Sequence, residues 1–412
     1  MKYLVHHDAV LAQPPEGPLV PYLESFAVWV SEQGYTACSL RSKVRTAAGF
    51  SKWLEHNGVG IRRIRAEHVT AYLRYRARIY RSKNGAQTTL ESLLHFLRSN
   101  QIAPAEQASE RLRSPIELCL QDYVTYLREV RALAEGTIIT YVPFVRAFLV
   151  ECFRDGKVTL SCLCARDVLR FVRHHAHHLR PGRAKNMTNA LRSFLRYASC
   201  RGDVALDLAA AVPVVPNWSM PDIPRAIAPD QTRRLLASID RRTAVGRRDY
   251  AILLLLARLG LRAGEVVALE LEDIDWTEGC LTIRSCNGLH NELPLPTDVG
   301  TAIAAYLRNG RPSSSCRRVF LRARAPITGF TSSAAVANVV RHSLRRAGID
   351  APTGGAHQFR HGFATDMLRH GASLDEIGQL LGHNCPQSTT IYAKVDIKAL
   401  RKLAVPWPGG KR

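Results

Sequence analysis

The chain has 412 residues, of which 46% are hydrophobic and 22% charged, which is enough apolar material for several cores and for two or three domains. The longest uncharged apolar run, residues 251–257, is far shorter than the roughly 18 residues of a membrane span, and the N-terminus lacks the apolar core of a signal peptide. We therefore expect a soluble, cytoplasmic bacterial protein whose scattered cysteines, without a CxxC pair, are reduced thiols.

The charge indicates a polyanionic partner. Lysine and arginine total 57 against 35 acidic residues, a formal net charge of +22, and arginine supplies most of the excess. Arginine is the better bidentate ligand for phosphate, so the bias favours double-stranded DNA as the partner. A GC-rich genome would also favour arginine over lysine, and it is the alternative explanation.

Apolar residues in the first half recur at a constant spacing, which predicts two similar helical modules over residues 1–108 and 109–216. The matched positions include Leu40 with Ile138, and Phe50 with Phe148. Chance similarity between two helical segments is the alternative. The helix expected at residues 186–200 has one apolar stripe and polar residues elsewhere. Candidate contacts to the DNA backbone are the basic residues of the two modules: Arg41, Lys43, Arg45, Arg62, Arg63, Arg65, Lys185, Arg192 and Arg196.

Four histidines lie close together at His174, His175, His177 and His178. No second group of ligand residues lies nearby in the sequence, so a solvated helix or loop is favoured over a metal site. We expect no metal and no cofactor.

A proline-rich linker at residues 217–228 precedes a domain of different pattern at residues 229–412. Helices are expected to begin at Pro229 and Asp249, and residues 279–295 alternate like a small antiparallel sheet with a turn at Asn287-Gly288. The predicted fold class is mainly α, with two helical DNA-binding modules and an α-rich catalytic domain that together form a clamp around DNA.

Four segments of this last domain carry the residues with the most informative chemistry. Arg262 and Glu265 lie in LRAGE, His357 and Arg360 in HQFRH, His383 in LLGHN, and Tyr392 in TTIYA. Each segment alone is weak evidence for a catalytic site, because an Arg–Glu pair is usually a surface pair and a tyrosine in an apolar run usually lies in the core. Their combination suits attack on a phosphodiester. Guanidinium groups can neutralise the charge of a pentacoordinate transition state, imidazoles can move a proton, and a phenol can be the nucleophile.

The boxes RAGEV, HQFRHGFAT, LLGH and TIYA resemble those of the tyrosine recombinase (phage integrase) family in order and spacing, over about residues 225–400. The resemblance implies that Arg262 and Arg360 grip the scissile phosphate, that His357 assists proton transfer and that His383 donates a hydrogen bond to the phosphate. It also implies that Tyr392 attacks and leaves a 3′-phosphotyrosine. Glu265 would only orient Arg262 and the adjoining backbone.

One element of the family pattern is missing. Family members usually have a lysine in the hairpin between the two arginines, which protonates the leaving 5′-oxygen. Here the aligned position is Cys286, and no lysine occurs between Lys185 and Lys394. His290 could be the acid, another group such as Arg284, Cys286 or a water could replace it less efficiently, or the chain could be catalytically impaired.

The resemblance implies a site-specific recombinase, an integrase or transposase of a mobile element, that works as a homo- or hetero-tetramer on two duplexes. Residues 397–405 are amphipathic enough to pass between neighbouring subunits or to pack on their own domain. A type IB topoisomerase-like relaxing enzyme would use the same chemistry. A DNA-binding partner subunit without catalysis is the alternative from another class.

Overall fold

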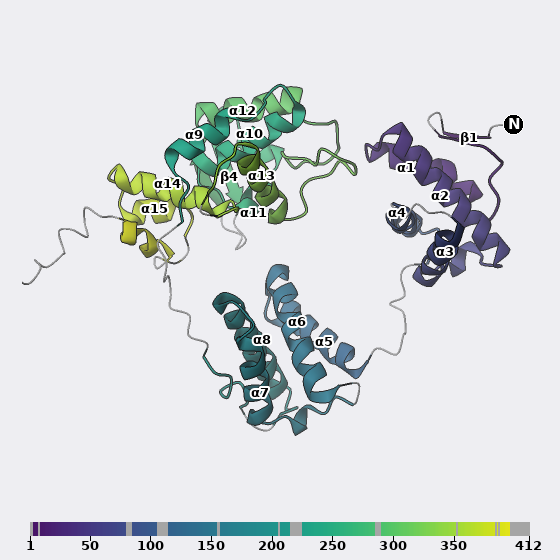
Figure 1. The fold of residues 1–412 in the computed structure, drawn as a ribbon, viewed down its shortest axis with the longest axis horizontal. Coiled ribbons are helices and arrows are strands. Elements are labelled where there is room, and N and C mark those ends of the chain that lie inside the picture. Colours follow the sequence, from purple (N-terminus) through teal and green to yellow (C-terminus); the bar gives the residue numbers. More distant parts are fainter. Residues whose placement is uncertain are drawn as a thin grey trace, which may run out of the picture. The chain divides into compact units, whose positions relative to one another are not determined.

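The structure is a computed structural model, and by its internal contacts the chain divides into two compact units, residues 106–221 and residues 1–105 with 222–412. Figure 1 labels the helices and strands along the chain. Three large hydrophobic cores lie within residues 5–103, 116–212 and 227–359, and a smaller fourth cluster lies within residues 364–392. The residues that the structure describes are 3–6, 9–79, 85–104, 114–154, 157–204, 207–214, 225–284, 290–351, 353–383, 385 and 388–395.

The first core is formed mainly by helices. They are α1 (Leu23–Glu32), α2 (Ala37–His56), α3 (Ala66–Ile79) and α4 (Ala86–Ser99), with the short helices η1 (Val20–Tyr22) and η2 (Ile61–Arg63). Thr36 caps α2 by accepting the backbone N–H of Ser39, and the buried face of that helix includes Leu40, Val44 and Phe50. A hairpin of β1 (Tyr3–His6) and β2 (Ala9–Leu11), which the sequence pattern did not predict, adds Val5 and other apolar residues to this core.

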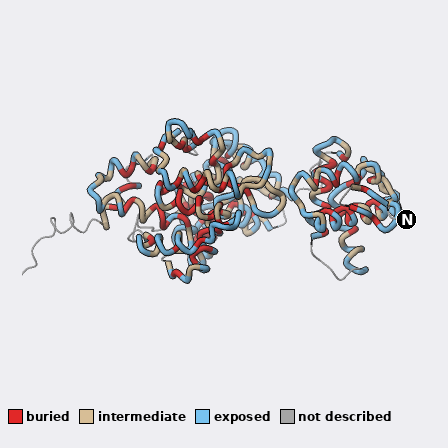
Figure 2. The backbone as a smooth tube through the Cα atoms, turned by 90° about the horizontal axis from the view of Figure 1, so that it is seen from above, coloured by how far each residue is buried: buried red, intermediate tan, exposed pale blue. Residues whose placement is uncertain are grey.

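The second core belongs to the unit of residues 106–221. Its elements are α5 (Pro115–Thr125), η3 (Tyr126–Val130), α6 (Glu135–Phe153), η4 (Leu160–Cys162), α7 (Ala165–Ala176) and α8 (Pro181–Cys200). The predicted stripe of α8 is confirmed, because Met187, Leu191 and Phe194 are all buried. Figure 2 shows the same alternation of buried and exposed backbone along the helices of both units.

Helix α6 is long and apolar enough by composition to cross a membrane. It contains the charged residues Glu135, Arg146 and Glu151, so the expectation that the sequence has no long uncharged apolar run still holds. A single helix of this kind is weak evidence, since the core helix of a soluble protein passes the same test. In this chain Ile138, Phe148 and Leu149 of α6 pack in the second core.

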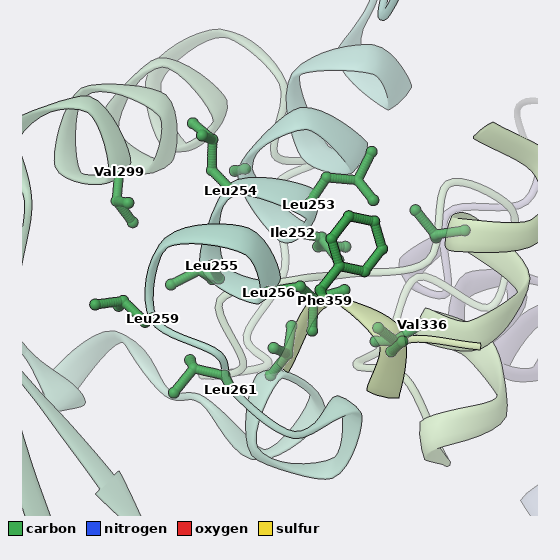
Figure 3. Close-up of a cluster of buried hydrophobic side chains, with 14 of the residues drawn as sticks. Ile252, Leu253, Leu254, Leu255, Leu256, Leu259, Leu261, Val299, Val336 and Phe359 are labelled. Atoms are coloured by element: carbon green, nitrogen blue, oxygen red, sulfur yellow. The ribbon is translucent and has the colours of Figure 1, made fainter. Parts of the chain in front are cut away.

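The third core surrounds α10 (Ala244–Arg258), whose residues Ile252–Leu256 are all buried. Val299, Val336 and Phe359 from three other helices pack around it (Figure 3). Those helices are α12 (Thr297–Asn309), α13 (Ser333–Arg346) and α14 (His357–Arg369), and the remaining elements are α9 (Pro229–Ala237), α11 (Ala263–Ala268), η5 (Leu271–Asp273), α15 (Leu374–Leu380) and η7 (Thr390–Val395).

The predicted small sheet is present and antiparallel. It comprises β3 (Ile274–Asp275), β4 (Cys280–Arg284) and β5 (His290–Pro294) in that order, and Ile283 pairs with Asn291. The turn predicted at Asn287-Gly288 lies outside the described residues. The helix predicted to begin at Pro229 does so, whereas the one expected from Asp249 begins earlier, at Ala244, directly after its N-cap residue Thr243.

Candidate functional site

Arg262 is placed by a sharp break between two helices. Helix α10 ends at Arg258, and Gly260 then adopts a left-handed conformation with φ +60°. A Cβ at Gly260 would lie 2.8 Å from the ring of Phe363, so glycine is required there for both conformation and space. Arg262 follows as the N-cap residue of α11. The position at which α10 ends therefore determines where the backbone of Arg262 lies.

Glu265 binds Arg262 twice. Its carboxylate accepts the backbone N–H of Arg262 at 2.7 Å and the Nη1 of the same residue at 2.7 Å. Arg262 Nη2 also lies 3.5 Å from the carbonyl oxygen of Gly382. The glutamate thus fixes both the start of α11 and the direction of the guanidinium group, which is the geometry that an orienting residue needs.

Arg360 is the most deeply buried charged residue of the site, with 2% of its surface exposed. Its guanidinium donates to the carbonyl oxygens of Gly260, at 2.9 Å, and of Leu381. Burial, together with the charge of Arg262, lowers the pKa of Arg360 to about 10, so the group is still a cation at neutral pH. Helix α14 thereby brings a second guanidinium beside the first.

Two histidines of α14 stand next to Arg360. The rings of His357 and His361 are 4.7 Å apart and nearly perpendicular, because residues four apart share one face of a helix. Burial and then the charge of Arg360 lower the pKa of His357. Burial, His357 and Arg360 lower the pKa of His361 to about 4. At neutral pH both imidazoles are therefore uncharged.

His383 lies in the loop after α15, and its Nδ1 is 2.7 Å from the hydroxyl oxygen of Thr389. Burial and the nearby Arg360 and Arg262 lower the pKa of His383 to about 4. With Nδ1 occupied by the threonine, Nε2 is the ring nitrogen left to face a ligand. Thr389 itself precedes the short helix that contains Tyr392.

Tyr392 is buried, with 2% of its surface exposed, and packs against Ala364, Ile377 and Leu381. Its hydroxyl oxygen lies 3.2 Å from Nδ1 of His361. The arginines and histidines near Tyr392 in the sequence pattern predict a phenol activated by surrounding cations. In the structure burial raises the pKa of Tyr392 and outweighs the lowering effect of Arg360 and Arg262, so the hydroxyl is protonated in the free chain.

A small pocket lies where the start of α11, strands β4 and β5, helix α14 and the end of α15 meet. Arg262, Glu265, Arg360, Gly382 and Asn291 are among the residues that line it. Asn291 comes from β5, and a Cβ on Gly382 would lie 3.9 Å from its amide nitrogen. Sequence reasoning missed Asn291 and His361. The signals were present: Asn291 neighbours His290 on the predicted hairpin, and His361 follows His357 by four residues.

The hairpin offers less support for the candidate replacements of the missing lysine. Side chains alternate along a strand, so His290 lies on the opposite face of β5 from the pocket residue Asn291 and is exposed. Arg284 pairs with Glu270 at 3.1 Å and with Asp273 at 2.7 Å. Cys286 lies outside the described residues. The geometry therefore does not favour His290 or Arg284.

The basic residues of the two N-terminal cores differ in how far they are exposed and could contact DNA. Arg41, Arg45, Arg62, Arg63, Arg65, Lys185 and Arg196 are exposed. Lys43 is only 8% exposed and its ammonium lies 4.4 Å from the ring centre of Tyr35, while Arg192 donates to the carbonyl oxygens of Val212 and Pro213. Lys43 and Arg192 are thus engaged within the protein, so the exposed residues are the better candidates for DNA contacts.

Among the residues that the structure describes, no group of three or more histidine, cysteine or acidic side chains could hold a metal ion. His174 and His175 lie in the last turn of α7, and His175 binds Glu151 at 3.0 Å. None of the described cysteines forms a disulfide.

Comparison with known proteins agrees with this geometry. Residues 225–398 match the model of the phage integrase family. The chain is 53% identical to the integrase/recombinase y4rA of Sinorhizobium fredii over 409 residues, which cover 99% of each protein. It is 31% identical to the tyrosine recombinase XerD of Mycobacterium tuberculosis over 316 residues, 71% of this chain and 97% of XerD.

Solved structures show the same fold. XerH recombinase bound to its difH substrate aligns with a TM-score of 0.57 at 17% identity, covering 72% of this chain and 98% of XerH. A lambda integrase fragment bound to a core site aligns with a TM-score of 0.53 at 15% identity, covering 71% and 98%. The matching family model and the recombinase relatives define an enzyme that cleaves and rejoins DNA strands. The chain belongs to the phage integrase family of tyrosine recombinases.

Proposed function

We propose that this protein is a site-specific recombinase that cuts DNA through Tyr392 and rejoins it without an external energy source. The observation that carries the proposal is the convergence of Arg262, Arg360, His383 and Tyr392 from four separate segments on one small region. The family relationship and the names of the relatives, integrase/recombinase and tyrosine recombinase, support the same function.

The roles follow from the chemistry of each group. Arg262 and Arg360 would bind the non-bridging oxygens of the scissile phosphate, and their fixed geometry lets them stabilise charge in the transition state without reorganisation. His383 would donate from Nε2 to the same phosphate, and neutral His357 would accept a proton. The oxygen of Tyr392 would form a bond to phosphorus while the bond to the 5′-oxygen breaks, which leaves a 3′-phosphotyrosine and a free 5′-hydroxyl.

The burial of Tyr392 adds a requirement. Because the hydroxyl is covered and protonated in the free chain, we infer that binding of DNA moves the segment around Thr390–Val395 or its neighbours before attack. The cost of that movement would be met by contacts with the cognate duplex, as in other systems where substrate binding completes a catalytic site.

The proton for the leaving oxygen needs a donor other than the usual lysine. Asn291 can donate a hydrogen bond to the 5′-oxygen but cannot release a proton. We propose that a water or Cys286 delivers it, with His290 as a weaker candidate because of its face on β5. Losing one general acid typically slows a reaction by about 10²- to 10⁴-fold rather than abolishing it, so the chain is proposed to be a working enzyme.

The cellular setting follows from the relatives. We propose that the protein is an integrase or transposase of a bacterial mobile element, acts in the cytoplasm and assembles as a tetramer on two duplexes. One structural relative is a lambda integrase tetramer bound to a Holliday junction. The two N-terminal helical cores, with the catalytic domain, would form the clamp around DNA.

The test uses nicked suicide duplexes built from the DNA that flanks the gene, resolved on a denaturing gel. We expect a covalent adduct with the wild-type chain and none with Tyr392→Phe. Binding of a duplex without any adduct would instead support the non-catalytic partner subunit. Relaxation of supercoiled plasmids without regard to sequence would support the topoisomerase-like activity.

A further inference from the structure

His361 makes the one hydrogen-bonding contact that the structure gives to the Tyr392 hydroxyl among the described residues. The separation of 3.2 Å between Nδ1 and Oη is within hydrogen-bond range, and the two rings are arranged edge to face with centroids 5.7 Å apart. The contact joins the middle of α14 to the short helix η7. Helices α14 and η7 pack against each other, and this packing holds His361 and Tyr392 side by side.

The direction of this hydrogen bond follows from the charge state of both groups. His357, Arg360 and His383 surround the His361 ring, and burial together with His357 and Arg360 lowers the pKa of His361 to about 4. The ring is therefore neutral at pH 7, with a proton on one nitrogen only. Burial keeps Tyr392 protonated, so its O–H can donate to an unprotonated Nδ1.

We propose that His361 is a positioning residue for the nucleophile: as the Nε2–H tautomer it accepts the Tyr392 hydroxyl at Nδ1 and so directs the lone pairs of Oη toward the phosphate. The proposal rests on the function proposed above. The opposite polarity, in which Nδ1–H donates to Oη, would occupy a lone pair that attack requires. A neutral imidazole can hold the hydroxyl without competing with Arg262 and Arg360 for the phosphate.

The role differs from that of His357. His361 stays next to the oxygen that attacks, whereas His357 lies beside Arg360 on the preceding turn. With so low a pKa, His361 is a weak base and does not keep the phenolic proton, which passes to His357 as the bond between Oη and phosphorus forms. Its contribution is orientation, and misplacing a reacting atom by about 1 Å can slow a reaction by about 10²-fold.

The first test needs no DNA. In the full-length chain labelled with 15N-histidine, nitrogen NMR at pH 7.5 identifies His361 by the signal that disappears in His361→Asn. We expect an unprotonated Nδ1 whose chemical shift changes in Tyr392→Phe. A protonated Nδ1, or a shift that does not respond to Tyr392→Phe, would overturn the proposal. Because this readout is independent of cleavage, it can fail while the recombinase function stands.

The second test measures single-turnover adduct formation on a nicked duplex that the wild-type chain cuts. His361→Ala and His361→Phe remove the acceptor, and we expect each to slow cleavage by about 10- to 100-fold with duplex binding unchanged. His361→Asn places an amide oxygen near the position of Nδ1 and should retain most of the rate. An asparagine variant as slow as alanine would show that the acceptor is not what matters. An alanine variant as fast as wild type, or faster, would show that the contact is dispensable or restrains the tyrosine.

Discussion

The hydroxyl of Thr389 and Nδ1 of His383 lie 2.7 Å apart and connect the loop after α15 to the segment that contains Tyr392. Thr389 is 3% exposed, so water does not compete for this bond. The threonine fixes which nitrogen of His383 is free. One short contact thereby links the loop of His383, the proposed phosphate ligand, to the segment of Tyr392, the proposed nucleophile.

Replacing Thr389 with valine should reveal the value of that contact. Thr389→Val conserves shape but leaves Nδ1 of His383 unpaired, and removing a group that orients a functional histidine typically costs about 10- to 100-fold in activity. We expect adduct formation to slow by that range while duplex binding is retained. Thr301→Val, at an exposed position of α12, is the matched control. Equal rates for the two variants would contradict the assignment.

Glu265→Ala removes both hydrogen bonds to Arg262. The loss of the capping interaction should lower the free energy of unfolding by about 1 kcal/mol, and the released guanidinium should bind the phosphate less well. We expect slower cleavage together with lower stability, measured by urea denaturation and the adduct assay. Glu24→Ala on α1 is the control. A variant that loses stability but cleaves at the wild-type rate would limit Glu265 to a structural role.

Acid should destabilise the catalytic domain through its histidines. The pKa values of His361 and His383 are about 4 in the folded chain, against an ordinary value of 6.5. The unfolded chain therefore binds protons that the folded chain does not, and stability present above pH 6.5 is lost as the pH falls toward 4. The expected slope corresponds to about two protons taken up on unfolding.

Urea denaturation at a series of pH values between 7.5 and 4 measures that slope. His361→Gln and His383→Gln should each reduce it, whereas His370→Gln, at an exposed position, should not. A wild-type free energy of unfolding that stays constant over this range would mean that the two imidazoles are not neutral in the folded chain.

Asn291 and His290 are adjacent on β5, and we expect their replacement to affect cleavage differently. Asn291 lines the pocket with Arg262 and Arg360, whereas His290 lies on the other face of β5. Asn291→Ala should slow cleavage more than His290→Ala does. A 5′-phosphorothiolate leaving group, which needs no acid, shows whether either change acts on leaving-group protonation. If His290→Ala is strongly impaired and the phosphorothiolate rescues it, His290 is the acid after all.

Neighbouring basic residues of α2 should differ in their contribution to DNA binding. Arg41 is exposed, while Lys43 is buried against Tyr35. Each phosphate contact contributes about 0.9 to the slope of log affinity against log salt concentration. We expect Arg41→Gln to reduce the slope by about that amount and Lys43→Gln to leave it unchanged, as measured by fluorescence anisotropy with a labelled duplex. Equal slopes for wild type and Arg41→Gln would remove Arg41 from the interface.

Much of the fold could be predicted because its signals are local. The stripe of α8 and the alternation in β4 and β5 follow from the period of apolar residues. The start of α9 follows from Pro229, a residue that is favoured in the first turn of a helix. The β1–β2 hairpin was missed because strands of four and three residues give too little alternation to recognise. The start of α10 was missed because Gly246, Arg247 and Arg248 interrupt the apolar pattern after its first residues, and the N-cap residue Thr243 sets where the helix begins.

The site was predictable in its residue types but not in its contacts. Order and spacing identified Arg262, Arg360 and Tyr392, yet no sequence pattern shows that Tyr392 faces His361 across two elements. Nor does the sequence reveal that burial raises the pKa of Tyr392 by more than the two arginines lower it, because desolvation depends on packing from α14 and α15. The sequence likewise does not show that Lys43 is buried, because Tyr35 packs beside it only in the folded chain.

The covered position of Tyr392 bears on how safely a cell can hold this protein. An exposed, ionised phenol beside two arginines could attack any phosphodiester that diffused past it. Here the hydroxyl is protonated, enclosed and bonded to a neutral imidazole, so chance encounters with the chromosome meet an unreactive surface. Under the proposed function, breakage would depend on the arrival of a duplex that binds strongly enough to open the site, and the resting conformation itself would protect the genome.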